Sequence, residues 1–174
     1  MDLYRPVLFL HVTAIIGMFA ALAVEWVTVQ RLRRATSCEQ ARDWTQVFNV
    51  LPALGAPSAI TALVSGIYLA TTLGVWRFGW VAVALPTLIA AALAGGLTAP
   101  SRKRVRVALG ERVGGLPRDI EAQLRQAFWL RSLRVRTALL IGLVFEMTVK
   151  PDAGVWVMAA VAIGGIAWGL ASRS

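Results

Sequence analysis

Residues 6–29 read PVLFLHVTAIIGMFAALAVEWVTV, an apolar run in which His11 and Glu25 are the ionisable side chains. A helix that crosses a bilayer needs about 20 predominantly apolar residues. This run is long enough to cross and too apolar to lie in water. It therefore predicts a first membrane-spanning helix at residues 6–29.

Four more apolar runs follow along the chain. They predict spanning helices at residues 48–73, 78–100, 130–149 and 153–172. The run at 130–149 opens with Arg131, Arg134 and Arg136, whose long side chains would have to reach back to the membrane surface. If this run lies on the surface instead, the bundle has four spans. The expected fold class is an all-α integral membrane helical bundle with five transmembrane helices, or four, in a single domain over residues 1–174.

The composition agrees with a membrane protein. Hydrophobic residues make up 57% of the chain and charged residues 16%, against about 25% charged in an average soluble domain. The one cysteine, Cys38, forms no internal disulfide and no thiolate metal site by itself. The sequence holds no HExxH, CxxC or phosphate-binding loop, and its one histidine excludes a multi-histidine site within a chain. We therefore expect no metal site and no catalytic site.

The positive charges predict the orientation. The formal net charge is +9, and fifteen of the eighteen Lys and Arg residues fall on one side of a five-span bundle. Cytoplasmic segments of membrane proteins are rich in Lys and Arg. We therefore expect the N-terminus outside and residues 101–129 inside, in a bacterial inner membrane. Because the cations lie between apolar runs, nucleic-acid binding is disfavoured as their cause.

Residues 101–129 form the longest polar segment. After Pro117, the apolar residues Ile120, Leu124 and Phe128 recur every four positions, which predicts a short amphipathic helix on the inner membrane surface. A run of cations precedes it and predicts contacts to anionic lipid head groups. These cations are Arg102, Lys103, Arg104 and Arg106.

Ionisable residues inside a membrane are functional candidates by default. By a helical rise of about 1.5 Å per residue, His11 lies roughly 9 Å and Glu146 roughly 6 Å below the outer rim. The two side chains are then level, and one expectation is an ion pair between them. The other is that Glu146 pairs with Lys150, one helical turn later.

Glu25 returns to nearly the same face of the first helix as His11. The stripe on this face consists of His11, Ile15, Met18, Leu22 and Glu25. It predicts a polar pathway from His11 at the outer side to Glu25 at the inner side. The alternative is that Glu25 pairs with the arginines at 31, 33 and 34. His11 is also a candidate haem ligand, and the alternative for it is a packed, hydrogen-bonded histidine.

Small residues recur at helical spacing and predict close contacts between helices, within one bundle or between copies of the chain. One such stripe is Ser58, Ala62 and Gly66, a second is Gly55 and Ala59, and Gly17 and Ala21 lie on the first span. The last apolar run contains a GxxxG sequence at residues 165–169.

The first span has a recognisable shape, with Leu10-His11 near its start and Arg31-Leu32-Arg33-Arg34 after its inner end. Together with the Met147-Thr148-Val149-Lys150-Pro151-Asp152 turn before a glycine-rich span, it resembles small bacterial membrane families of the copper-resistance D and HemJ types. In HemJ-type proteins a first-span histidine is associated with haem, and His11 occupies that position here.

These observations lead to three functional expectations. The first is a small, non-enzymatic, transporter-like or accessory membrane subunit that works as a homo-oligomer or with membrane-protein partners in the lipid bilayer. The second is a haem-binding membrane redox protein that uses His11. The third is a structural subunit of a larger respiratory or photosynthetic complex.

Overall fold

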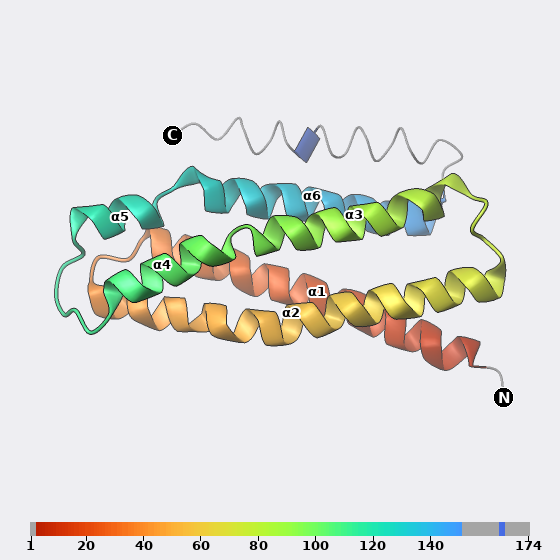
Figure 1. Cartoon of the computed structure of the whole chain (residues 1–174), viewed down its shortest axis with the longest axis horizontal. Helices are drawn as coiled ribbons and strands as arrows, with labels where there is room; N and C mark the ends of the chain where they lie inside the picture. The colour runs from red at the N-terminus through yellow and green to blue at the C-terminus, as the bar shows by residue number, and fades with distance from the viewer. Residues whose placement is uncertain (1–2, 151–163, 166–174) are drawn as a thin grey trace.

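The computed structural model describes residues 3–150 and 164–165, and within them the regular structure is helical. Figure 1 shows long helices lying roughly along one axis, with α4 and α5 together at one end. An isolated bridge joins Ser37 to Gly115 at that end. The helices are α1 (Tyr4–Arg33), α2 (Cys38–Leu73), α3 (Gly79–Gly96), α4 (Ala99–Leu109), α5 (Arg118–Leu124) and α6 (Ala127–Val149).

Three helical segments of the described chain are long and apolar enough to cross a membrane. They are Tyr4–Arg33, Cys38–Leu73 and Gly79–Leu109, the last combining α3 and α4. This confirms the membrane helical bundle. The helix α6 covers the predicted fourth span but, with its arginines, is not among these three. The predicted fifth span, 153–172, lies outside the described residues except for Gly164 and Gly165.

Capping, rather than hydropathy, marks where α2 begins and ends. The helix α2 starts at Cys38, well before the apolar run at residue 48, because the Ser37 side chain accepts a hydrogen bond from the Gln40 N–H. It ends at Leu73, as predicted, where Gly74 adopts a left-handed φ of 64°. The apolar runs therefore mark the part of each helix that suits lipid, and not the whole helix.

The segment at 101–129 is more ordered than predicted. Its first residues belong to α4, which follows α3 directly and carries Pro100 in its first turn, where proline is tolerated. The predicted amphipathic helix forms as α5, but Ile120 and Leu124 are 0% and 1% exposed, in the protein core. Because α4 and α1 cover α5, its apolar face does not lie on the membrane. Phe128 belongs to α6 and is 43% exposed.

Two antiparallel helix pairs form the bundle. The helix α1 packs most extensively on α2, and α3 packs on α6 (Figure 1). Glycines shape the first pair. A Cβ built on Gly17 would collide with the Ser58 side chain, and one on Gly55 would touch Ala21 at 3.5 Å. The small residues of the first two spans therefore pack within one chain, which was the first of the two alternatives expected.

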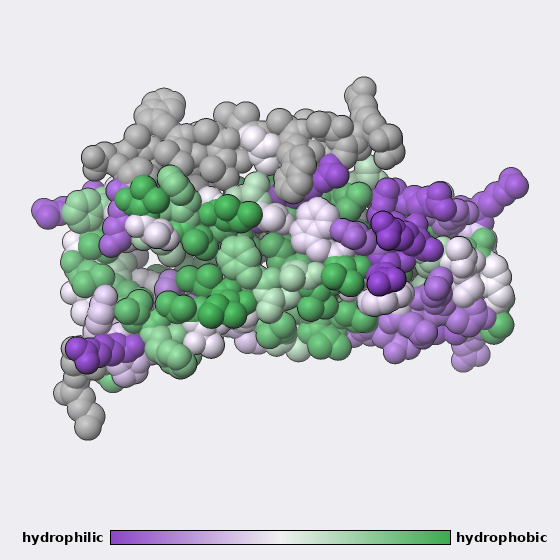
Figure 2. All heavy atoms as spheres, turned by 180° about the vertical axis from the view of Figure 1, so that it is seen from behind, coloured by the Kyte–Doolittle hydropathy of each residue, from purple (hydrophilic) through white to green (hydrophobic). Residues whose placement is uncertain are grey.

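The surface has the asymmetry of a membrane protein. Hydrophilic side chains gather at the end that carries α4 and α5, and apolar side chains cover most of the remaining face in Figure 2. Apolar residues on the long helices are strongly exposed, with Phe9 at 73% and Ile60 at 61%. Such a surface is costly in water and suits a hydrocarbon environment.

Candidate functional site

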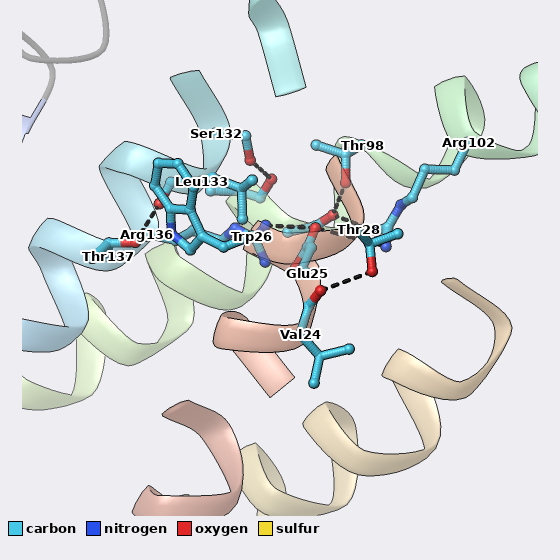
Figure 3. Close-up of polar contacts among 12 residues, drawn as sticks. Val24, Glu25, Trp26, Thr28, Thr98, Arg102, Ser132, Leu133, Arg136 and Thr137 are labelled. Carbon is cyan, nitrogen blue, oxygen red and sulfur yellow. Dashed lines mark hydrogen bonds and ion pairs between the residues drawn. The ribbon is translucent and has the colours of Figure 1, made fainter. Parts of the chain in front are cut away.

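A charge cluster of Glu25, Arg102 and Arg136 lies inside the bundle near its polar end (Figure 3). Glu25 Oε1 is 2.7 Å from Arg136 Nη2 and 3.8 Å from Arg102 Nη1. The three side chains are 9%, 17% and 12% exposed for Glu25, Arg102 and Arg136. The cluster joins α1 to α4 and α6, so chain segments far apart in sequence meet at one carboxylate.

A glycine makes room for the arginines. A Cβ on Gly95 would lie 3.0 Å from Arg136 Nη1. The Gly95 carbonyl accepts hydrogen bonds from Arg102 Nη2 at 3.0 Å and from the Thr98 hydroxyl at 2.7 Å. The Arg102 guanidinium also lies 5.2 Å from the ring centroid of Phe48. These contacts of Arg102 offset part of the cost of burying its guanidinium.

Neutral hydrogen bonds support the same region. Trp26 Nε1 donates to the Thr137 hydroxyl at 2.9 Å, which ties α1 to α6 (Figure 3). The Ser132 hydroxyl donates to the Ala94 carbonyl at 2.8 Å, which ties α6 to α3. Side-chain hydrogen bonds beside the charge cluster thus join α6 to both α1 and α3.

The observed partners of Glu25 differ from those favoured by the sequence. The arginines at 31, 33 and 34 lie roughly 9 Å or more farther along α1 by its rise per residue, which separates them from Glu25. Arg33 instead donates to the Arg125 carbonyl at 2.7 Å, and Arg31 lies over the Trp44 ring. The cations that contact Glu25 come from other helices, Arg102 from α4 and Arg136 from α6. Tertiary packing brings them to Glu25.

The predicted lipid-contacting run divides between two environments. Arg102 points into the charge cluster, and Arg106 donates to Asn49 Oδ1 at 2.6 Å. Lys103 and Arg104 are exposed on α4. Two of the four cations therefore bond to the protein, and the exposed pair is available to lipid head groups.

The second feature is an interhelical cavity of about 260 Å³ between α1, α2, α3 and α6. Tyr4, Trp76 and Lys150 line the end near the start of α1, which is the outer end in the expected topology, and Phe19 and Leu88 line the opposite end. The wall between them is mainly aliphatic, and His11 belongs to it. We refer to this space as the His11 cavity.

The His11 ring is fixed by the neighbouring helix. Its Nδ1 is 2.9 Å from the Ser65 hydroxyl oxygen, and the residue is 9% exposed. Gly66 allows this approach, since a Cβ there would lie 3.1 Å from His11 Cε1. His11 is therefore a packed, hydrogen-bonded histidine, which was one of the two alternatives. The Nδ1 edge of its ring contacts Ser65 of α2.

Neither ion pair predicted for Glu146 forms. His11 bonds to Ser65, and both carboxylate oxygens of Glu146 lack a hydrogen-bond partner although the residue is fully buried. The Lys150 ammonium lies 5.6 Å from the Trp80 ring centroid instead. Lys150 is the C-cap of α6 and has a left-handed φ of 51°. Its side chain lies over Trp80 of α3 and not beside Glu146 of α6.

The predicted stripe on α1 divides in the same way. His11, Ile15 and Met18 line the His11 cavity, whereas Glu25 belongs to the charge cluster. The cavity and the cluster are separate features of the bundle. The stripe therefore marks the inward face of α1 and does not bring His11 and Glu25 into one site.

Sequence reasoning missed Ser65 as the partner of His11. It also missed Arg102 and Arg136 as the partners of Glu25. Ser65 had a signal, because it lies about one turn after Ala62 and two turns after Ser58, on the face that packs against α1. The two arginines had none, because the pairing depends on how α4 and α6 pack.

Comparisons with protein families, curated proteins and solved structures gave no match.

Proposed function

We propose that this chain is a multi-pass protein of a bacterial inner membrane with five spans and an outside N-terminus. In this proposal it is a non-enzymatic, transporter-like or accessory subunit that holds an apolar small molecule in the His11 cavity. The observation that carries the proposal is the cavity itself, about 260 Å³ in volume and walled by four helices.

The size and lining of the cavity support this role. An apolar cavity of about 150 Å³ is enough to bind benzene, so the larger volume suits a compound of two fused rings. Small-molecule sites combine an apolar lining with a few placed polar groups, which matches largely apolar walls with the His11 imidazole along them and Lys150 at one end. Because the described chain carries no nucleotide-binding domain, transport through it would be passive or coupled to an ion.

Quenching of tryptophan fluorescence tests the cavity. Trp76 and Trp80 line it, so bromonaphthalene bound there should quench their emission in protein reconstituted into lipid nanodiscs. We expect a saturable component that Ala70→Phe removes, because Ala70 is a buried lining residue. Ala53→Phe, at an exposed position of the same helix, is the matched control and should retain it.

Quenching that never saturates, or that both variants leave equally intact, would contradict binding in the His11 cavity. Co-purification with larger respiratory or photosynthetic proteins, with no effect of changing His11, Glu25 or Glu146, would instead identify a structural subunit.

A haem-binding redox protein is the second candidate, and the hydrogen bond of His11 favours it. Ligating histidines commonly hold one ring nitrogen in a hydrogen bond, which orients the ring and leaves the other nitrogen for the metal. His11 has this arrangement with Ser65, and its position matches the resemblance to HemJ-type proteins. One histidine supplies one axial ligand, or two across a homodimer. A Soret absorption band in the purified protein that His11→Ala abolishes would establish haem, and its absence from wild-type protein would exclude this candidate.

A further inference from the structure

The polar group within the His11 cavity lies midway along its wall. On α1 the lining extends from Tyr4 to Phe19, roughly 22 Å by helical rise, and His11 is roughly 10 Å from the outer end. The described lining residues deeper than His11 are apolar, among them Met18 and Leu88. A ligand that fills the cavity therefore meets one imidazole amid hydrocarbon.

Ser65 determines which nitrogen of that imidazole carries the proton. The Ser65 hydroxyl has one hydrogen, and its acceptors on its own helix are the Thr61 carbonyl, at the shorter distance, and the Ala62 carbonyl at 3.3 Å. Its oxygen is then an acceptor toward His11, and on this ground we assign Nδ1 as the donor in the 2.9 Å contact. In a neutral imidazole the other nitrogen, Nε2, carries a lone pair and no hydrogen.

The charges around the cavity keep the imidazole neutral. Lys150 is the charged residue in the described lining, and none of the described lining residues is acidic. A second positive charge among apolar walls, with no facing carboxylate, would be disfavoured by burial and by Lys150. Nε2 is therefore a hydrogen-bond acceptor.

We infer that the His11 cavity selects an apolar aromatic compound with a hydroxyl group, of the phenol or quinol class. This assignment rests on the proposed function. The ligand O–H donates to Nε2 of His11, and the rings lie against the apolar wall between α1 and α3. A phenolic hydroxyl is a stronger donor than an aliphatic one, and Phe19 and Trp80 offer aromatic surfaces. Ser65 acts as a positioning residue, because it holds the imidazole in the tautomer that accepts.

The same geometry excludes a close relative of such a ligand. An ether of equal shape offers acceptor oxygens, which cannot pair with the Nε2 lone pair. The ether would therefore lose the hydrogen bond and keep the apolar contacts. The contrast between a phenol and its methyl ether isolates the contribution of His11.

Competition against bromonaphthalene in nanodiscs tests the assignment, with naphthol and methoxynaphthalene as the matched pair. The wild-type protein should bind naphthol about tenfold more tightly, as expected for one hydrogen bond. His11→Phe keeps an aromatic ring without the acceptor, so it should still bind bromonaphthalene and bind the two competitors equally. Ser65→Ala removes the acceptor that holds the proton on Nδ1, so it should reduce the preference for naphthol over methoxynaphthalene by several-fold.

The possible outcomes separate the two claims. Saturable bromonaphthalene binding without a preference for naphthol in wild-type protein overturns the ligand assignment alone. A preference that survives in His11→Phe overturns it as well, and tighter binding of methoxynaphthalene would mean that Nε2 donates. Absence of any saturable bromonaphthalene binding overturns the proposed function and the ligand assignment together.

Discussion

Glu25 is a buried carboxylate that two arginines contact. Its carboxylate is 9% exposed and lies between two guanidinium groups, one at 2.7 Å. Taking such charges out of water is costly, and the pairing offsets that cost only while both signs are present. Removing the carboxylate would leave Arg102 and Arg136 as uncompensated neighbours.

Glu25→Ala should therefore lower the free energy of unfolding by about 3 kcal/mol or more. Glu121 offers the control, because it pairs with Arg125 at 2.7 Å on the surface, with side chains 40% and 61% exposed. Glu121→Ala should cost less than about 1 kcal/mol. Denaturant unfolding of the two variants in the same detergent measures the difference, and equal losses would contradict a special role for the buried cluster.

His11 and Glu146 show how far burial constrains a polar residue. His11 satisfies its Nδ1 through Ser65. Glu146 is fully buried, and neither of its carboxylate oxygens has a hydrogen-bond partner. A buried carboxylate without a partner is far less costly when protonated than when ionised. The two residues therefore do not form the ion pair that their predicted depths suggested.

At the scale of helices, the last turns of α3 offer a matched pair of glycines. An alanine at Gly95 would place its Cβ 3.0 Å from Arg136 Nη1, whereas one at Gly96 would meet nothing within 4 Å. The two positions are adjacent in one helix. They therefore have similar helix propensity and differ in what faces them.

Gly96→Ala should raise the free energy of unfolding by roughly 0.5–1 kcal/mol, because alanine loses less backbone entropy in a helix. The free energy of unfolding of Gly95→Ala should be lower than that of Gly96→Ala by about 1 kcal/mol or more, because the new Cβ forces Arg136 to shift from its position beside Glu25. Thermal unfolding of both variants in detergent measures this. Equal stabilisation by the two alanines would show that Arg136 moves freely, contrary to a fixed charge cluster.

The start of α2 is the element that hydropathy placed least well. The Cys38 N–H donates to the Gly114 carbonyl at 2.8 Å, and Glu39 accepts from the Gly114 N–H at 2.8 Å. Arg42 donates to the Gly110 carbonyl at 2.9 Å. The connection between α4 and α5 is thus held against the first turns of α2. A segment expected to lie on the inner membrane surface is instead bonded to the bundle.

For the whole molecule, the proposed orientation can be tested at two exposed positions. The turn between α2 and α3 contains exposed Arg77, and the connection between α4 and α5 contains Val113, which is 80% exposed. These positions lie at opposite ends of the bundle in Figure 1. In the proposed topology, Arg77 faces outward and Val113 faces the cytoplasm.

Cysteines at these two positions test the orientation in intact cells. A membrane-impermeant maleimide should label Arg77→Cys from outside, and should label Val113→Cys only in inverted vesicles. The native Cys38 is 1% exposed, so the unmodified chain provides a low background. The reverse pattern would place the N-terminus inside, and labelling of both positions from one side would contradict three crossings before α6.

The amino-acid sequence by itself determined that the chain is helical and suited to a membrane. Apolar runs such as 6–29 and 48–73 predicted α1 and the membrane-crossing part of α2, because crossing a bilayer requires a local run of apolar residues. It also predicted which small residues permit close packing, as Gly17 and Ser58 do, because a missing side chain has the same effect in any helix pair.

The tertiary structure alone decided the partners of the ionisable residues. Glu25 contacts Arg136, more than a hundred positions away, and His11 contacts Ser65 on α2. The apolar face of α5 lies against protein and not lipid. Composition and periodicity describe what each helix presents, whereas a charge or an imidazole is satisfied by whichever neighbour packing brings within about 3 Å.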